Sequence, residues 1–302
     1  MELRRAMRVG LGLVALAGAV AVAAGCGGND AEGSDTETVR LAVTDLTGLE
    51  ELQREFGAFV AAFEAESGAE MEFFPVADRV AAAAALDADR VDLVFTGPAE
   101  YVVMRERTDS EPVVSINRPG YRSCVYTKAD SEHRSLEELA GEKVAMSDVG
   151  STSGHLGPSQ MFVDAGIEMP GGVEVLTVGD AVHQALVRDD VAAVGVGCHD
   201  YEEAMEAEDD PSEFRVIAEG DPLPPDVIVA HPDVDDATIE LVRETFEENW
   251  EDVLLPAMLE GKDNAKYEGA TLEASPEDGD YDGVRAMYRA VGVEDFSGFV
   301  GE

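Results

Sequence analysis

Three hydroxyl side chains and two glycines lie together in one short stretch of the sequence, Gly150-Ser151-Thr152-Ser153-Gly154, and His155 follows directly. The preceding residues 142–147 have the apolar pattern of a short buried strand, and residues 156–165 have that of a helix that ends at Gly166. A strand that leads through such a turn into a helix directs the first backbone N–H groups and the positive end of the helix dipole at one point. The stretch therefore predicts a site for an oxyanion, with the hydroxyls as additional donors.

The same residues allow two other interpretations. Ser151 or Ser153 alone would be an ordinary helix N-cap, because Ser and Thr are common at that position. Either serine as a nucleophile, with His155 as its base, would instead indicate a secreted phosphatase or esterase. The enzyme is disfavoured because so close a spacing leaves no separate orienting acid, and the chain has no Gly-x-Ser-x-Gly motif. No cofactor is implied, and the five histidines are too scattered along the chain to indicate a metal site.

The charge of the chain excludes several classes of partner. Its 302 residues include 64 acidic and 21 basic side chains, for a formal net charge of −43. Hydrophobic residues still make up 45% of the chain, which indicates a folded protein with an acidic surface rather than a disordered acidic chain. So much negative charge disfavours nucleic acid and anionic lipid as partners. It also favours a halophilic, salt-rich habitat, since in molar salt the Debye length falls to about 3 Å and self-repulsion is screened.

The first residues have the pattern of an export signal, with three arginines before an apolar run at residues 9–24. The sequence Ala23-Ala24-Gly25-Cys26 resembles the lipobox of a lipoprotein signal, in which Cys26 becomes the lipid-bearing N-terminus. An uncleaved membrane anchor is the alternative, although the run hardly reaches the length of about 20 residues that a membrane span needs. We therefore expect residues 1–25 to be a signal peptide, and either interpretation places the remaining chain outside the cytoplasmic membrane.

Residues 26–38 are rich in Gly, Asp, Glu and Ser without an apolar period, which predicts a disordered tether. The chain beyond it, residues 39–302, is long enough for two lobes. In an oxidising exterior Cys124 and Cys198 would form a disulfide, or they would be two buried free thiols, and the sequence does not separate these alternatives.

From residue 39 onward, apolar strand patterns alternate with helical patterns. In the first series the strands are expected at 39–43, 70–76 and 91–95, with helices at 52–67 and 78–86 between them. A second series of the same kind runs through residues 135–208. Alternation of this kind is typical of parallel sheets with helices on their faces. The sequence therefore predicts an α/β protein of two lobes, each with a mostly parallel sheet and with a ligand cleft between them.

We expect lobe 1 to consist of residues 39–118 and 216–302, and lobe 2 of residues 119–215. Ligands of such sheets bind outside the carboxyl ends of the strands. This rule predicts two facing rims, one at Thr44–Thr47, Asp78–Arg79 and Thr96–Tyr101, the other at the Ser151 stretch, Gly179-Asp180 and Cys198–Asp200.

Several pieces of the sequence resemble the substrate-binding proteins of ABC importers for phosphate, phosphite and phosphonates. They run in order through nearly the whole chain after the tether, at Val91–Tyr101, Pro119–Ser123, Gly150–Pro158, Pro222–Ile228 and Gly279–Arg285. The resemblance implies a type II periplasmic-binding fold whose two lobes close on an oxyanion. It also implies an ABC permease in the membrane as partner and no enzymatic activity, and we expect a monomer. A binding protein that senses an oxyanion without transport is the alternative.

The ligand residues that the resemblance implies are Thr96 and Tyr101 in one lobe and Ser151, Thr152, Ser153, His155 and Asp200 in the other. The hydroxyls would hold the oxyanion, and Asp200 would accept from a protonated ligand oxygen or an amine. At Arg79 and Asp180 the chain departs from relatives, which often have an aromatic residue and a histidine there. Arg79 would either clamp a phosphate or phosphonate or pair with neighbouring acids. The identity of the oxyanion therefore stays open.

Overall fold

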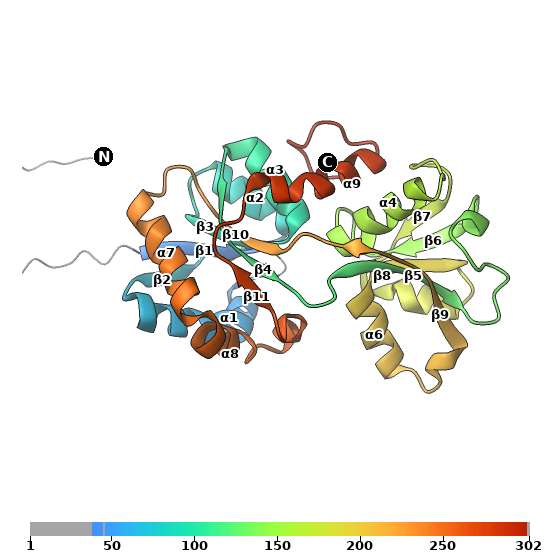
Figure 1. The fold of residues 1–302 in the computed structure, drawn as a ribbon, viewed down its shortest axis with the longest axis horizontal. Helices are drawn as coiled ribbons and strands as arrows, with labels where there is room; N and C mark the ends of the chain where they lie inside the picture. The colour runs from blue at the N-terminus through green and yellow to red at the C-terminus, as the bar shows by residue number, and fades with distance from the viewer. Residues whose placement is uncertain (1–37, 45, 301–302) are drawn as a thin grey trace, which may run out of the picture. The chain divides into compact units, whose positions relative to one another are not determined.

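The computed structural model describes residues 38–44 and 46–300. The predicted signal peptide, the lipidation site Cys26 and nearly all of the predicted tether lie outside these residues. Within the described ranges, no helix is long and apolar enough to cross a membrane. Figure 1 shows two β-sheets, each with helices packed against it, and both belong to the compact unit that begins at Thr36. We call the first sheet with its helices lobe 1 and the second lobe 2.

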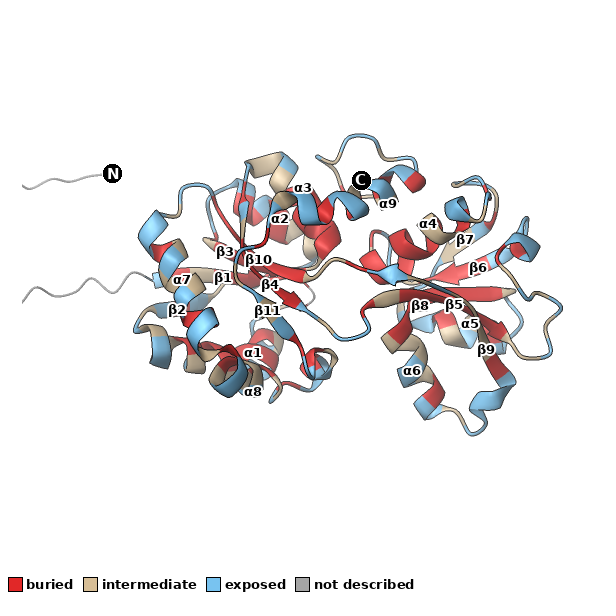
Figure 2. Cartoon of the chain, viewed as in Figure 1, coloured by how far each residue is buried: buried red, intermediate tan, exposed pale blue. Residues whose placement is uncertain are grey.

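The sheet of lobe 1 has six strands in the order β11-β4-β10-β3-β1-β2. The strands are β1 (Thr38–Val43), β2 (Glu70–Phe73), β3 (Leu93–Thr96), β4 (Glu111–Asn117), β10 (Asp226–Ala230) and β11 (Thr271–Glu273). β1 pairs in parallel with β2 and β3, whereas β10 is antiparallel to β3 and β4. Every residue of β3 and β10 is buried, because helices cover both faces of the sheet. Figure 2 shows these strands as the buried centre of the lobe.

Helices of lobe 1 form two apolar layers. They are α1 (Leu49–Ser67), α2 (Arg79–Asp87), α3 (Pro98–Thr108), α7 (Asp236–Asn249), α8 (Leu255–Met258) and α9 (Asp282–Ala290). In one layer Phe59 and Phe63 of α1, one turn apart, pack against Phe246 of α7. In the other layer the alanines of α2 lie near Tyr101 and Tyr288. A π-helical turn at Trp250–Leu254 lies between α7 and α8.

The sheet of lobe 2 has five strands in the order β7-β6-β8-β5-β9. The strands are β5 (Arg122–Lys128), β6 (Lys143–Met146), β7 (Glu174–Thr177), β8 (Ala193–Gly197) and β9 (Phe214–Pro222), and the helices are α4 (Gly157–Asp164), α5 (Val182–Val187) and α6 (Cys198–Ala207). β6 is parallel to β7 and β8, and β5 is antiparallel to β8 and β9. Both sheets thus contain more antiparallel pairs than expected. The reason is that β5 and β10 enter their sheets directly from the other lobe and are antiparallel to their neighbours.

Two short segments connect the lobes, residues 118–121 between β4 and β5 and residues 223–225 between β9 and β10. The sequence placed the return to lobe 1 at residue 216, but β9 pairs with β5 in the sheet of lobe 2 as far as Pro222. The reason is that β9 pairs with β5 from Phe214 to Pro222, with two shifts in register, and the strand ends just before Pro224-Pro225, where backbone N–H groups are lacking. We therefore propose residues 223–225 as the second lobe boundary.

Cys124 and Cys198 form a disulfide in lobe 2, with their Cα atoms 4.9 Å apart. The partner of Cys124 in the β5–β8 ladder is Val196, so the chain needs only two more residues to bring Cys198, the first residue of α6, beside it. Of the two alternatives for this pair, the structure has the disulfide. It ties the start of α6 to the middle of the sheet.

Candidate functional site

A cavity of about 840 Å³ is lined by residues of both lobes. From lobe 1 and the first connecting segment come Arg79, Gly97, Glu100, Arg118, Tyr121, Asp226 and Lys266; the residues from lobe 2 include Tyr126, Ser147, Asp148, Ser151, Thr152, Ser153, Asp180, His183, His199, Asp200, Glu203 and Glu208. Many of these residues follow the carboxyl ends of β3, β6 and β8, which is where parallel strands present their ligand sites. Parts of both rims that the sequence predicted therefore line this cavity.

The Ser151 stretch is a tight loop that ends in a π-helical turn at Thr152–Leu156 before α4 begins. Gly150 adopts a left-handed conformation with φ of 84°, which favours glycine. The loop closes on itself because the Ser147 N–H donates to the Gly154 carbonyl at 2.9 Å. A Cβ at Gly154 would lie 2.5 Å from the side chain of Ser147, so a larger residue does not fit there. The sequence predicted an ordinary α-helix start at this point. The structure has a π-helical turn instead, which results from tertiary packing.

Each hydroxyl of the stretch has a different environment. The Ser151 Oγ accepts from the Gly154 N–H at 3.2 Å, so Ser151 is a helix cap as well as part of the cavity wall. The Thr152 Oγ1 accepts from the backbone N–H of Ala99 at 3.1 Å. Ala99 lies in the first turn of α3, in lobe 1. Ser153 lines the cavity, and its carbonyl accepts from the Ser123 hydroxyl. Two helix starts, one from each lobe, thus converge at Thr152.

His155 does not line the cavity in the described structure. Its ring is buried, and its Nδ1 accepts from the backbone N–H of Gly150 at 3.2 Å, which holds the loop in place. Burial lowers the pKa of His155, so the ring is neutral with its proton on Nε2. The ring positions the loop because the π-helical turn directs it inward, and its contact with a ligand stays a prediction.

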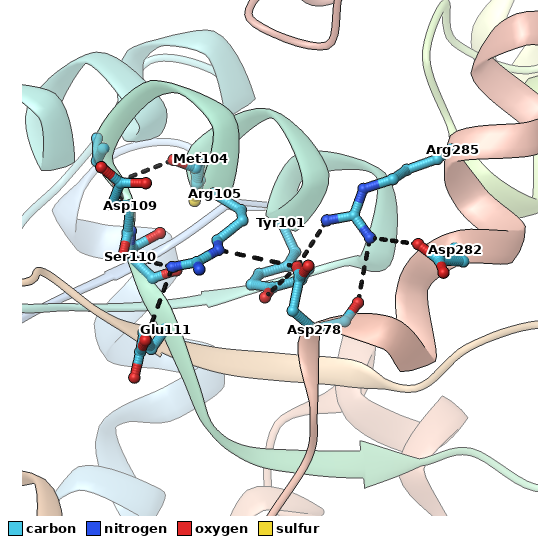
Figure 3. Close-up of polar contacts among 10 residues, drawn as sticks. Tyr101, Met104, Arg105, Asp109, Ser110, Glu111, Asp278, Asp282 and Arg285 are labelled. Atoms are coloured by element: carbon cyan, nitrogen blue, oxygen red, sulfur yellow. Dashed lines mark hydrogen bonds and ion pairs between the residues drawn. The ribbon is translucent and has the colours of Figure 1, made fainter.

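Tyr101 and Thr96 also lie away from the cavity. Figure 3 shows Tyr101 pointing at Asp278, and its hydroxyl donates to the Asp278 Oδ1 at 2.9 Å. The same oxygen accepts from Arg285 of α9 at 2.6 Å. The Thr96 Oγ1 lies 3.1 Å from the Thr44 Oγ1, beside a void of about 30 Å³ behind the cavity. In this structure the packing partners of each side chain direct it away from the cavity, and the ligand contacts of Thr96 and Tyr101 stay predictions.

A buried ion pair forms the floor of the cavity. The Nη2 of Arg118, the first residue after β4, lies 3.0 Å from the Asp226 Oδ1, and the two side chains are 9% and 4% exposed. The Asp226 Oδ2 accepts from the Tyr267 hydroxyl at 2.7 Å. The guanidinium lies 3.6 Å from the centroid of the Tyr121 ring, a cation–π contact. Burial raises the pKa of Tyr121, so its hydroxyl stays protonated beside the cavity.

Sequence reasoning missed Arg118 and Asp226 as site residues, although Asp226 lies in a stretch that resembles the family and Arg118 directly precedes another. The available signal was positional. Each is a charged residue at the end of a strand, next to the Pro-Gly or Pro-Pro pair at which the chain changes lobes. Only the structure shows that the two meet, because they are 108 residues apart in the chain.

Arg79 both pairs with an acid and lines the cavity. Its Nη1 lies 2.8 Å from the Glu100 Oε1, and the carboxylate of Glu100 is nearly fully buried. Arg79 is placed there because the Asp78 side chain caps α2 at the preceding position, accepting from the Ala81 N–H at 2.7 Å. Together with Arg118 and Lys266, it gives the lobe 1 side three cationic side chains, facing two lobe 1 carboxylates, Glu100 and Asp226.

The lobe 2 side of the cavity is acidic. Its five carboxylates are those of Asp148, Asp180, Asp200, Glu203 and Glu208, and we call them the acidic wall. Asp200 caps α6 by accepting from the Gly197 N–H at 3.1 Å and lies 3.0 Å from the His199 Nε2. Glu208 lies 2.7 Å from the Nε2 of His183, whose Nδ1 is 3.1 Å from the Tyr126 hydroxyl. Among the described residues, no three His, Cys, Asp or Glu side chains are arranged to hold a metal ion.

Residues 47–253 match the family described as ABC transporter, phosphonate, periplasmic substrate-binding protein. The phosphate-import protein PhnD of Mycolicibacterium smegmatis is 30% identical over 162 residues, which cover 50% of this chain and 50% of that protein. The match thus spans about half the length of that relative.

Two solved structures resemble most of the chain. One is a binding protein component of an ABC phosphonate transporter from Pseudomonas aeruginosa, with a TM-score of 0.64 and 17% identity over 84% of this chain and 86% of that one. The other is PhnD1 from Prochlorococcus marinus in complex with methylphosphonate, with a TM-score of 0.65 and 16% identity over 85% of this chain and 99% of that one. At these identities the likeness establishes the fold, which is the two-lobed type II periplasmic-binding fold that the sequence predicted.

Proposed function

Because the chain belongs to the family of periplasmic substrate-binding proteins of ABC phosphonate transporters, we propose that it captures a phosphorus oxyanion outside the cytoplasmic membrane and delivers it to an ABC permease. Members of this family are binding proteins and not enzymes. The observation that carries the proposal is the convergence of two helix starts, one from each lobe, at Thr152 beside the cavity. A binding protein that senses the same ligand without transport would use the same site.

The mechanism we propose is closure of the two lobes on the ligand. Ser151, Thr152 and Ser153 would donate to the ligand oxygens from lobe 2, while the start of α3 and Arg79 would act from lobe 1. In this structure the Ala99 N–H donates to the Thr152 hydroxyl. This hydroxyl oxygen therefore lies at the position at which the start of α3 would hold a ligand oxygen. A ligand that contacts both lobes favours the closed form by the contacts it makes only there.

The acidic wall bears on which oxyanion is bound. A bare dianion in this cavity would face five carboxylates of lobe 2, and Asp148, Asp180 and Glu203 have no ion pair or side-chain hydrogen bond in the described structure. An ammonium group on the ligand would neutralise part of this charge. We therefore propose a zwitterionic aminophosphonate, with its phosphonate at the hydroxyls and its ammonium toward Asp200, as the preferred ligand over phosphate or methylphosphonate.

We also propose that Cys26 carries a lipid and that the chain is a monomeric lipoprotein at the outer face of the membrane. The lipobox-like sequence before Cys26 supports this, together with an acidic tail long enough to act as a tether. Metabolic labelling with a radioactive fatty acid checks it: label on the protein that Cys26→Ser removes is the expected result. Label that persists in that variant would contradict the assignment of the cysteine.

The ligand proposal is tested by calorimetry of the purified protein with phosphate, phosphite, methylphosphonate, 2-aminoethylphosphonate and sulfate. We expect binding of phosphorus oxyanions, with 2-aminoethylphosphonate the tightest. A variant with Ser151, Thr152 and Ser153 all changed to Ala should lose this binding without a change in its circular dichroism. Ser212→Ala, an exposed lobe 2 residue away from the cavity, is the control. Affinity retained in the triple variant, or no heat with any phosphorus oxyanion, would sink the proposal.

A further inference from the structure

The C-terminal helix α9 makes a contact between the lobes outside the cavity. It belongs to lobe 1 but contacts α4 and the π-helical turn of lobe 2. Leu156 of that turn is fully buried in the same apolar cluster as Val284 and Tyr288 of α9. We call this contact between α9 and α4 the seam. A groove of about 330 Å³ runs along it, lined among others by Met287 of α9 and Met161 of α4.

The seam and the cavity lie on opposite sides of the connecting segments. Arg118 and Tyr121 of the first segment line the cavity, whereas Pro222 and Leu223 at the second line the groove, and the two hollows share no lining residue among those described. Figure 1 shows α4 and α9 on one side of these segments and α6, which borders the cavity, on the other. A rotation about the connecting segments that narrows the cavity must therefore widen the seam.

α9 is fixed to lobe 1 rather than to lobe 2. Arg285 binds both the backbone carbonyl and the carboxylate of Asp278, which also accepts from Tyr101 of α3. The Tyr288 hydroxyl donates to the Ala99 carbonyl at 3.1 Å. On the lobe 2 side the contact is apolar and leaves the groove unfilled. Movement between the lobes is therefore expected at the seam, while α9 travels with lobe 1.

We propose that the seam sets the balance between the open and closed forms, and that Met287 is a positioning residue that limits how far the lobes open. In the open form Met287 and Met161 approach each other across the groove, and in the closed form they separate. A side chain too large for the groove would act as a wedge that disfavours the open form. Because apparent affinity scales with the fraction of protein in the binding-competent form, such a wedge tightens ligand binding without touching the ligand.

The test is Met287→Trp, with Ala286→Trp, an exposed position on the same helix, as the matched control. Spin labels are attached to Ala265→Cys in lobe 1 and Glu206→Cys in lobe 2, which are exposed neighbours of the cavity-lining Lys266 and Ala207. A Cys26→Ser background keeps the labels specific, since Cys124 and Cys198 are in a disulfide. The label-to-label distance in the ligand-free protein reports closure, and calorimetry with 2-aminoethylphosphonate reports affinity.

We expect Met287→Trp to shorten the mean distance between the labels and to tighten binding about tenfold, whereas Ala286→Trp leaves both unchanged. Met161→Trp fills the groove from the α4 side and should act in the same direction, which guards against poor folding of one variant. Equal distances in all variants, or a longer distance in Met287→Trp, would overturn the proposal. The affinity arm rests on the proposed function, but the distance measurement does not, so a protein that binds no oxyanion still decides the role of the seam.

Discussion

The two sides of the cavity are built differently. On the lobe 1 side Arg79 and Arg118 each lie within 3.0 Å of a carboxylate, so these two cationic side chains are paired. On the lobe 2 side the hydroxyls of the Ser151 stretch lie beside the acidic wall, three of whose carboxylates have no cationic partner among the described residues. The hydroxyls proposed to hold an anion thus lie next to charges that repel one. Under the proposed function, lobe 1 contributes ion-paired cations, while the acidic wall of lobe 2 selects the ligand by its charge.

The largest effect is expected from breaking the floor. Arg118→Ala leaves the Asp226 carboxylate buried without its partner, and removing one member of a buried pair costs about 3–5 kcal/mol of unfolding free energy. Arg122→Ala is the control, because Arg122 and Glu219 are 36% and 58% exposed and 4.0 Å apart, so its loss should cost about 0–1 kcal/mol. Urea unfolding measures both. If both substitutions lowered the unfolding free energy equally, the buried ion pair would contribute no more to stability than an exposed one.

Neutralising the acidic wall should change ligand preference. In Asp180→Asn/Glu203→Gln, two charges that repel an anion are removed, so we expect affinity for methylphosphonate to rise about tenfold. Affinity for 2-aminoethylphosphonate should fall, since its ammonium loses attraction. Glu206→Gln, an exposed residue of α6 outside the cavity, is the control and should change neither. If calorimetry gave the same change in affinity for both ligands, the hypothesis that lobe 2 selects the ligand by its charge would be wrong.

Raising the salt concentration should also change the affinities for the two ligands differently, but by less than neutralising the acidic wall does. The net charge of −43 and the acidic wall repel methylphosphonate, and raising the ionic strength from low to molar values screens this repulsion. We expect a few-fold gain in affinity for methylphosphonate and a smaller change for 2-aminoethylphosphonate. The measurement is a calorimetric salt series in which circular dichroism confirms the fold throughout. A fall in methylphosphonate affinity with salt would contradict the prediction.

The smallest effect concerns His155, which lies behind the hydroxyls and adds no positive charge to lobe 2. Burial lowers its pKa in the folded state, so between the folded pKa and the ordinary value of about 6.5 the unfolded chain binds the extra proton. Stability should therefore fall as the pH drops from 7.5 to 5.5, by less than about 1.4 kcal/mol per pH unit from this group.

One variant checks the assignment to His155. His155→Asn keeps an acceptor for the Gly150 N–H but cannot be protonated, so its unfolding free energy should fall less over the same pH range. Urea unfolding at the two pH values gives the comparison, and equal slopes for wild type and His155→Asn would show that the buried ring does not titrate as argued.

The sequence by itself determined the order of strands and helices, the division into two lobes and the position of the Ser151 stretch at the carboxyl end of a strand. These follow from local causes. Apolar periodicity distinguishes strands from helices, and glycine at Gly68 and Gly166 ends helices at which a left-handed residue is needed. The ordered resemblance to a family then indicated the fold, which the comparisons confirm.

Only the tertiary structure decided which side chains face the cavity. Tyr101 donates to Asp278, 177 residues away, and Arg118 pairs with Asp226, 108 residues away. Neither contact can be predicted from the local sequence. The disulfide between Cys124 and Cys198 likewise depends on the β5–β8 register. The physical reason is that periodicity assigns a residue to the buried face of an element, whereas the neighbour it meets there depends on how distant elements pack. The Ser151 stretch could be predicted from the sequence because its donors lie within a few residues of one another. The charged groups around it could not, because they come from distant parts of the chain.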